Sequence, residues 1–278
     1  MRQSSQRTGS RRNDRSRGWY DAFMLRELGK ADWQSILNLP DERIPKAILL
    51  RGTRNLRQQY DAHRSHFDDV IPVGLPNGIV EDVFVGRLSG QPVGYASVYG
   101  APMASEIVHL FGVLGTRLVV LTGCCGALAD EIEPGDLVVT SEAFCGEGAA
   151  AYYRQNATVV RPTIESTAIR SQAASKGFRV HVARMYTTAA LFAEGRHEID
   201  QWWSLGFGAV DMETATTLAV AEHFGMESLA IHFAFDNPRR GEHILLAEPD
   251  KQERRRCGNE SMTEIALSVI RDYLAAPG

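Results

Sequence analysis

Cysteine is scarce in this chain. The four cysteines are Cys124, Cys125, Cys145 and Cys257, and no two of them have the CxxC spacing that zinc sites use. So few cysteines in 278 residues also argue against a disulfide framework. We therefore expect no metal site, no disulfide and a reducing, cytoplasmic location.

The sequence also lacks long apolar runs and an excess of positive charge. No run approaches the roughly 18 apolar residues of a membrane span, and the N-terminus has no apolar stretch typical of a secretory signal. The formal net charge is −4 and the pI is about 6.1, so there is no basic field of the kind that nucleic-acid binding needs. We expect no membrane and no specific nucleic-acid partner, and a small molecule as ligand.

Apolar content is ample for one core. Hydrophobic residues make up 44% of the chain, which is enough for one large domain. Residues 1–18 differ, with six arginines, one acid and almost no apolar side chains, so they bury too little surface to offset the entropy of ordering. We expect a disordered Arg/Ser-rich tail over 1–18 and a single domain over 19–278.

Short apolar runs alternate with helical patterns along this domain. The runs predict buried strands, and the patterns between them predict helices. The predicted strands are 46–50, 92–100, 117–121, 136–144, 179–187 and 228–235, and the predicted helices are 19–39, 105–115, 165–177, 212–225 and 259–276. Gly115, Gly177 and Gly225 stand where a helix end needs a positive φ. The alternation predicts an α/β fold with helices on both faces of a sheet.

Ligands of such folds gather where strands end, and two of the predicted loops are rich in glycine. Arg51-Gly52-Thr53-Arg54 follows the first strand, and glycine there would let backbone N–H groups approach an anion. TGCCGAL, residues 122–128, follows the third, where close approach to a ligand and simple packing are both open. Without an assignable histidine partner, Cys124 is interpreted as a small filler and not as a nucleophile.

Two acidic positions carry the clearer chemical signal. Glu213 opens a predicted helix after Asp211-Met212, where the helix dipole would hold a carboxylate ionised as an acceptor for a pair of ribose hydroxyls. Asp236 ends an apolar strand, and burial would favour its protonated form, which could donate a proton to a leaving base. A charged helix start and an Asp-Asn-Pro turn are the purely structural alternatives. His232, on the same strand, is expected to point into the core and to bind no ligand.

Taken in order, these patches resemble the nucleoside phosphorylase and nucleosidase superfamily. Its members are of the purine nucleoside phosphorylase, uridine phosphorylase and methylthioadenosine/adenosylhomocysteine nucleosidase types. The matching patches are VVLTGCCGALADEIEPGDLVVT at 119–140, Asp211-Met212-Glu213, Phe235-Asp236 and Gly52. The resemblance implies one domain with a mixed, partly closed central sheet and helices on both faces. It implies cleavage of the N-glycosidic bond of a nucleoside or a nucleotide-like substrate.

The resemblance also implies roles for individual residues. Glu213 would bind the ribose 2′ and 3′ hydroxyls, Met212 would pack beneath the sugar, and Asp236 would be the general acid with Asn237 beside it. Phe192 would cover the base. Gly52 and Gly123, with Cys124, would face the nucleophile.

Three positions depart from the phosphorylases of this family. Leu121 stands where they have an arginine, Cys124 replaces a hydroxyl, and a further arginine falls on Leu56, which Arg54 and Arg57 flank. A phosphate dianion would be poorly neutralised without these cations, which slightly favours water as the nucleophile.

The positions that contact the base can also be compared with the family. The glutamine and arginine with which uridine-specific members read the base fall near Arg196 and Glu198 and match poorly, which argues against uridine. The Asp236 arrangement resembles the purine-handling branch, which favours a purine.

Two alternatives stay open. One is a phosphorylase that holds phosphate with Arg51, Arg54 or Arg57, and the other is a non-catalytic nucleoside-binding protein. We expect no cofactor, apart from inorganic phosphate as co-substrate in the phosphorylase case. The resemblance further implies a homo-oligomer, a dimer or a trimer of dimers.

Overall fold

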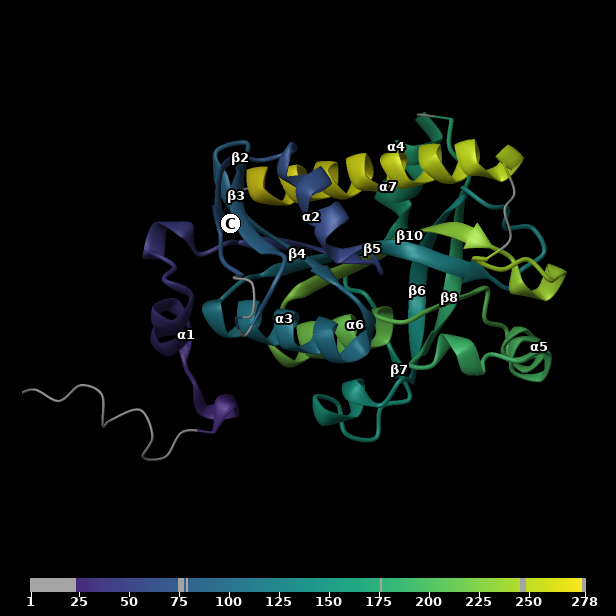
Figure 1. Cartoon of the computed structure of the whole chain (residues 1–278), viewed down its shortest axis with the longest axis horizontal. Helices are drawn as coiled ribbons and strands as arrows, with labels where there is room; N and C mark the ends of the chain where they lie inside the picture. The colour runs from purple at the N-terminus through teal and green to yellow at the C-terminus, as the bar shows by residue number, and fades with distance from the viewer. Residues whose placement is uncertain (1–23, 75–77, 79, 176, 246–248, 277–278) are drawn as a thin grey trace, which may run out of the picture.

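The computed structural model describes residues 24–74, 78, 80–175, 177–245 and 249–276. The predicted tail over 1–18, and the start of the predicted helix at 19–23, lie outside these residues. One sheet of ten strands forms the centre of the described part (Figure 1). Its strands are β1 (Ala47–Gly52), β2 (Asp68–Pro72), β3 (Val83–Leu88), β4 (Gln91–Val98), β5 (Leu118–Ala127), β6 (Leu137–Gly146), β7 (Val159–Val160), β8 (Val180–Thr188), β9 (Ala209–Asp211) and β10 (Glu227–Asp236).

Half of the sheet closes on itself. The strand order is β10-β6-β8-β9-β5-β1-β4-β3-β2, and a further pairing joins β10 to β5. The strands β5, β10, β6, β8 and β9 therefore form a ring, and β1, β4, β3 and β2 extend from it as an open sheet. Pairing is parallel between β1 and β5 but antiparallel between β10 and β6. The mixed, partly closed sheet implied by the resemblance is thus confirmed.

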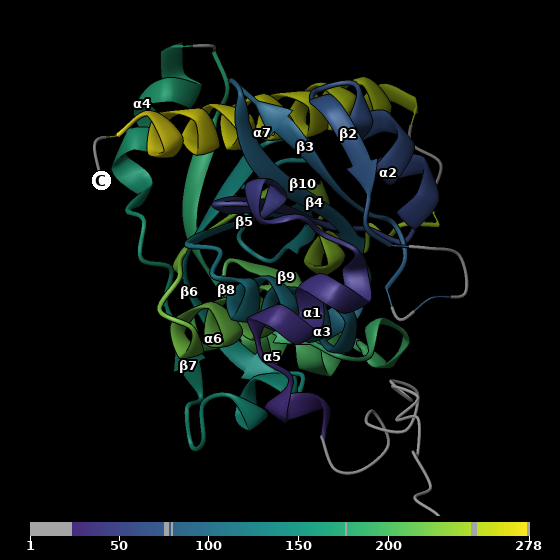
Figure 2. The same ribbon diagram turned by 90° about the vertical axis from the view of Figure 1, so that its left-hand side faces the viewer.

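Helices cover both faces of the sheet. In Figures 1 and 2, α7 runs across one face with α2 and α4 nearby, and α3, α6 and α1 lie against the opposite face. The helices are α1 (Lys30–Leu37), α2 (Leu56–Arg64), α3 (Gly100–Leu114), α4 (Ser166–Ser175), α5 (Arg196–Ser204), α6 (Thr214–His223) and α7 (Pro249–Ala275).

Alternation along β1 explains the two layers. Ile48 and Leu50 pack with residues of α3 and α6, whereas Ala47 and Leu49 pack with residues of α7. Each face of the central strands is apolar, so helices must cover both faces to keep them from water.

All six predicted strands are present, and so are the four predicted helices after residue 100. Gly115, Gly177 and Gly225 have the expected positive φ, at 95°, 79° and 65°. The predicted helix over 19–39 is shorter in its described part, which forms a short 3₁₀ turn and α1.

One local prediction is wrong. Residues 122–127, read as a loop after the third strand, continue β5 as far as Ala127. Both neighbours of β5 extend alongside it, since β1 pairs with it up to Thr122 and β10 pairs with it up to Gly126. The hydrogen-bond ladder therefore continues through glycines that would otherwise favour a turn.

Candidate active site

The ends of three parallel strands meet at one edge of the ring. β5 lies between β1, which ends at Gly52, and β10, which ends at Asp236. Asp236 pairs with Gly126, and β9 ends beside them at Asp211, which leads into Glu213 and α6. The two carboxyls singled out from the sequence, on Glu213 and Asp236, therefore stand at the same edge, where ligands of open α/β sheets bind.

Glu213 occupies the N-cap position of α6 and is only 6% exposed. Its Oε1 accepts a hydrogen bond of 2.7 Å from the backbone N–H of Gly100, the first residue of α3. Its Oε2 faces the end of β1 so closely that a Cβ atom at Gly52 would lie 2.9 Å from it. Glycine at position 52 is therefore required by the close approach of this carboxyl.

Burial, and not the helix dipole, sets the charge of Glu213. Its pKa is raised to about 8 by burial and by the nearby charge of Asp211, against the Gly100 hydrogen bond and the charge of Arg51. The expectation that the helix start would hold this carboxylate ionised is not supported, because burial and the charge of Asp211 outweigh the interactions that favour the charged form.

Asp211 holds the segment that carries Glu213. Its Oδ2 accepts hydrogen bonds from the backbone N–H groups of Glu213 and Thr214, at 3.1 and 2.8 Å, and from the Thr214 hydroxyl at 2.6 Å. Its Oδ1 accepts the Thr187 hydroxyl at 2.7 Å. Burial raises the pKa of Asp211, but the hydrogen bonds and the charge of His232 outweigh it and the pKa is lowered. This positioning role was not predicted from the sequence.

His232 is buried, as expected, but it faces the site. Its Nε2 lies 3.5 Å from Asp211 Oδ2 and 3.4 Å from the Thr214 hydroxyl. A Cβ atom at Gly123 would lie 3.2 Å from its Cδ2. The imidazole therefore fills the space between β5 and the start of α6, where it supports Asp211.

Asp236 and Asn237 stand at the end of β10 and are almost wholly buried, at 5% and 0% exposed. The Asn237 amide donates to the carbonyl of Ala129 at 3.1 Å, and its backbone N–H donates to Glu242 at 2.9 Å. The Asn237 Oδ1 is buried and has no partner among the described residues. Asn237 therefore braces the turn and leaves an acceptor available to a ligand.

Arg51 is a buried cation at this edge. It is 4% exposed, and its guanidinium donates to Asn259 of α7 at 2.6 Å and lies 6.0 Å from the ring centre of Phe233. No carboxylate of the described residues forms a salt bridge with it. Burial lowers its pKa, while the potential negative charges of Cys124 and Glu213 oppose that shift.

Cys124 faces the same space from β5. Cys124 is exposed as a residue, and desolvation by the surrounding protein raises the pKa of its thiol to about 11. At neutral pH the residue is therefore a thiol and not a thiolate. Its exposure differs from the expectation that it is a small buried filler.

The remaining predicted residues lie nearer the surface. Arg54 packs its guanidinium 4.7 Å from the ring centre of Tyr99 and 5.6 Å from that of Phe192. Phe192 is 86% exposed, so its ring stands at the mouth of the site. Arg57 forms ion pairs with Asp61 and Asp82, at 3.0 and 3.5 Å.

Two of the family departures can also be located, together with Met212. Leu121 is fully buried in the core between β5 and α3, and Leu56 begins α2. Met212 is half-buried between β9 and Glu213.

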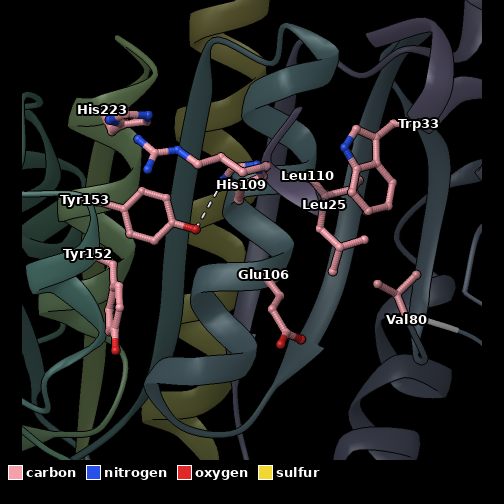
Figure 3. A pocket seen from close by; sticks show the side chains of 10 residues that line it. Leu25, Trp33, Val80, Glu106, His109, Leu110, Tyr152, Tyr153 and His223 are labelled. Carbon is pink, nitrogen blue, oxygen red and sulfur yellow. Dashed lines mark hydrogen bonds between the residues drawn. The ribbon is translucent and has the colours of Figure 1, made fainter. Parts of the chain in front are cut away.

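A cavity of about 400 Å³ lies elsewhere, between the C-terminal halves of α3 and α6 and the region of α1. Figure 3 shows Trp33, His109, Tyr153 and His223 around it, with a hydrogen bond of 3.1 Å between the Tyr153 hydroxyl and His109. None of the predicted site residues lines it. In the described part of the chain, no cluster of potential metal ligands and no helix able to span a membrane is found.

The partly closed sheet with carboxyls at its strand ends is an α/β fold with a candidate active site at one edge. Comparison with known proteins agrees. The sequence pattern of the Phosphorylase superfamily matches residues 53–271, so this chain belongs to that superfamily.

Individual relatives fall in the same group. A DeoD-type purine nucleoside phosphorylase of Clostridium beijerinckii is 24% identical over 245 residues, which cover 84% of this chain and 96% of that protein. A guanosine phosphorylase of Halorubrum lacusprofundi is 29% identical over 133 residues, 48% of this chain and 55% of the relative. The crystal structure of uridine phosphorylase from Vibrio fischeri superposes with a TM-score of 0.72 at 18% identity, covering 88% of this chain and 99% of the other, and shows the shared fold.

Proposed function

We propose that this protein cleaves the N-glycosidic bond of a purine nucleoside with inorganic phosphate, giving a free base and a sugar 1-phosphate. The observation that carries the proposal is the meeting of Glu213 and Asp236 at one edge of the ring, each almost fully buried. The purine nucleoside phosphorylase from Clostridium beijerinckii, which aligns with 84% of this chain, supports the purine and the phosphate.

Glu213 and Asp236 have different roles in this reaction. With Oε1 held by Gly100, Glu213 presents Oε2 to the ribose hydroxyls, as donor and acceptor while it is protonated and as acceptor only once it is ionised. Asp236 donates a proton to a ring nitrogen of the base as the C–N bond breaks, which makes the base a better leaving group. A phosphate oxygen then bonds to the anomeric carbon of an oxocarbenium-like sugar, and the protein mainly orients the reactants and stabilises charge.

The buried cation Arg51 supports phosphate as the nucleophile. A buried charge without an ionic partner is costly, and a bound dianion would supply the missing partner. Arg51 stands next to Gly52, and its charge acts on Cys124 and Glu213. The sequence alone favoured water because Leu121 and Leu56 replace cations, and Arg51 offers a cation in their place.

Hydrolysis is the second candidate, since Leu121 lies in the apolar core and the residue at 124 offers no hydroxyl. A panel of adenosine, inosine, guanosine and uridine, assayed for free base with and without phosphate in ¹⁸O-labelled water, separates the two. We expect release from purine nucleosides only with phosphate, and sugar 1-phosphate as product. Release in phosphate-free buffer with solvent oxygen on the anomeric carbon would instead establish hydrolysis.

Two variants refine this assay. Arg51→Met should raise the KM for phosphate more than the KM for nucleoside, because a bound dianion loses its cation. Arg57→Met is the matched control, since the ion pairs of Arg57 with Asp61 and Asp82 already neutralise it. Equal effects of the two variants would remove Arg51 from the phosphate site.

The proposed setting is a cytoplasmic homo-oligomer, a dimer or a trimer of dimers. It rests on the resemblance to the superfamily and on the low cysteine content, and gel filtration with light scattering would test the assembly.

A further inference from the structure

A third carboxyl, Glu194, reaches the site from the loop after β8. It directly follows the 3₁₀ turn Leu191–Ala193, two residues beyond Phe192. Its Oε1 is buried and has no hydrogen-bond partner among the described residues. Leaving a buried acceptor unpaired is costly, and native proteins rarely do so without a reason such as a missing ligand.

The loop of Glu194 is tied to the turn that follows Asp236. Arg196 donates a hydrogen bond of 2.7 Å to the carbonyl of Arg239, which lies in the 3₁₀ turn Pro238–Arg240 directly after Asp236-Asn237. Phe192, on the other side of Glu194, lies against Arg54 at the end of β1. These contacts bring the loop over the edge that holds Asp236.

Electrostatics agrees with this placement. Burial, and then the charge of Asp236, raise the pKa of Glu194 to about 7. The charge of Asp236 thus acts on Glu194, which agrees with the placement of both carboxyls at this edge.

A purine carries polar groups that the carboxyls of Asp236 and Glu194 can contact by hydrogen bonds. If Asp236 protonates a ring nitrogen of the base, Glu194 contacts the neighbouring group, which is the substituent on C6. An ionised Glu194 can only accept, so it suits an amino group and repels an oxo group. When protonated, it can donate to an oxo group instead.

We propose that Glu194 is a specificity-determining residue that accepts a hydrogen bond from the exocyclic amino group of the base and so selects 6-aminopurine over 6-oxopurine nucleosides. The inference rests on the proposed function, in which Asp236 protonates a purine at this edge. It adds a substrate preference to that function.

The test is the ratio of kcat/KM for adenosine to that for inosine, in the wild type and in Glu194→Gln. We expect the wild-type ratio to rise as the pH passes through about 7, and the variant ratio to be lower by about tenfold and independent of pH, because an amide can also donate to an oxo group. Glu198→Gln is the matched control, because Glu198 lies on the same segment and only caps α5 through the Gly195 N–H.

Binding of the free bases keeps the test independent of turnover. The ratio of the adenine and hypoxanthine dissociation constants, measured by calorimetry, should change in Glu194→Gln and not in Glu198→Gln. Unchanged ratios in Glu194→Gln, with normal base release, would overturn the role of Glu194 and leave the proposed function intact. Base release from no nucleoside would count against the proposed function, and the binding ratio would still decide on Glu194.

Discussion

The surroundings of individual residues determine the chemistry of this site. Glu213 is fixed by one backbone donor at Gly100 and by Asp211, which holds the turn beneath it. Asp236 and Asn237 are instead presented by the end of a buried strand. Substitutions at these positions should therefore separate binding from proton transfer.

We predict that Asp236→Asn lowers kcat by about 10²- to 10⁴-fold and changes nucleoside affinity by less than about tenfold, because an amide keeps the shape but donates no acidic proton. Single-turnover assays and equilibrium binding measure the two quantities separately. Wild-type turnover in this variant would refute the assignment of the general acid.

Glu213 and Asp236 could be singled out from the sequence because the patterns that mark them lie in their immediate neighbourhood along the chain. One stands at a helix start and the other at the end of an apolar run. The partners of Glu213 are not local, because Gly100 and Gly52 lie on elements far away along the chain. No spacing or periodicity of the sequence connects these positions, so the roles of Asp211 and Glu194 are found only in the fold.

Most of the long apolar runs were predicted as strands, but β3 was missed although it is almost wholly buried, and α5 was missed as well. The strands β1, β4, β5, β6, β8 and β10 follow the apolar runs, and of these β8 is only partly buried. The half-exposed strand β2 and the polar helix α2 carry too few apolar residues to be recognised, and β9 is only three residues long. The extension of β5 to Ala127 was also missed, because its glycines favour a turn locally and only pairing with the neighbouring strands keeps it extended.

The contact of α3 with α6 gives a prediction at this scale. Gly112 lies within α3, and a Cβ atom there would come 2.5 Å from the ring of Phe224 at the end of α6. An alanine would normally stabilise a helix by about 1 kcal/mol relative to glycine. We predict instead that Gly112→Ala destabilises the protein by about 1–3 kcal/mol, because the helices must move apart.

Thermal unfolding of Gly112→Ala, Phe224→Leu and the double variant checks this. The smaller leucine should restore room, so the double variant should be more stable than the two single losses added together. Simple additivity would mean that the two residues do not clash.

At the scale of the whole molecule, Asp136 at the start of β6 connects β8 and α7. Its carboxylate accepts hydrogen bonds from Arg179 at 2.9 Å, from His181 of β8 at 3.0 Å and from Arg254 of α7 at 3.3 Å. Burial raises its pKa, but the bonds from His181, the Glu133 N–H and Arg179 outweigh burial and the pKa is lowered. Its stabilising contribution is therefore present above the ordinary carboxyl pKa and is lost as the pH falls through the lowered one.

We predict that Asp136→Asn lowers the free energy of unfolding by about 1–3 kcal/mol at pH 7, and that the difference shrinks in acid as the wild-type carboxyl becomes protonated. Melting temperatures of both proteins over a pH series measure this. Asp130→Asn is the control, because its ion pair with Arg239 is exposed and contributes little. A difference in stability between the two proteins that stays constant down to low pH would show that packing, and not charge, causes the destabilisation.

The closed ring has a consequence for association between molecules. Closure leaves β2 as the last strand of the open half of the sheet. An open strand edge is a template on which other chains can aggregate. Here that edge carries Asp68 and Asp69 at its start and Pro72 at its end, and proline has no N–H to donate. The charged side chains and the missing donor thus disfavour pairing of another chain along β2.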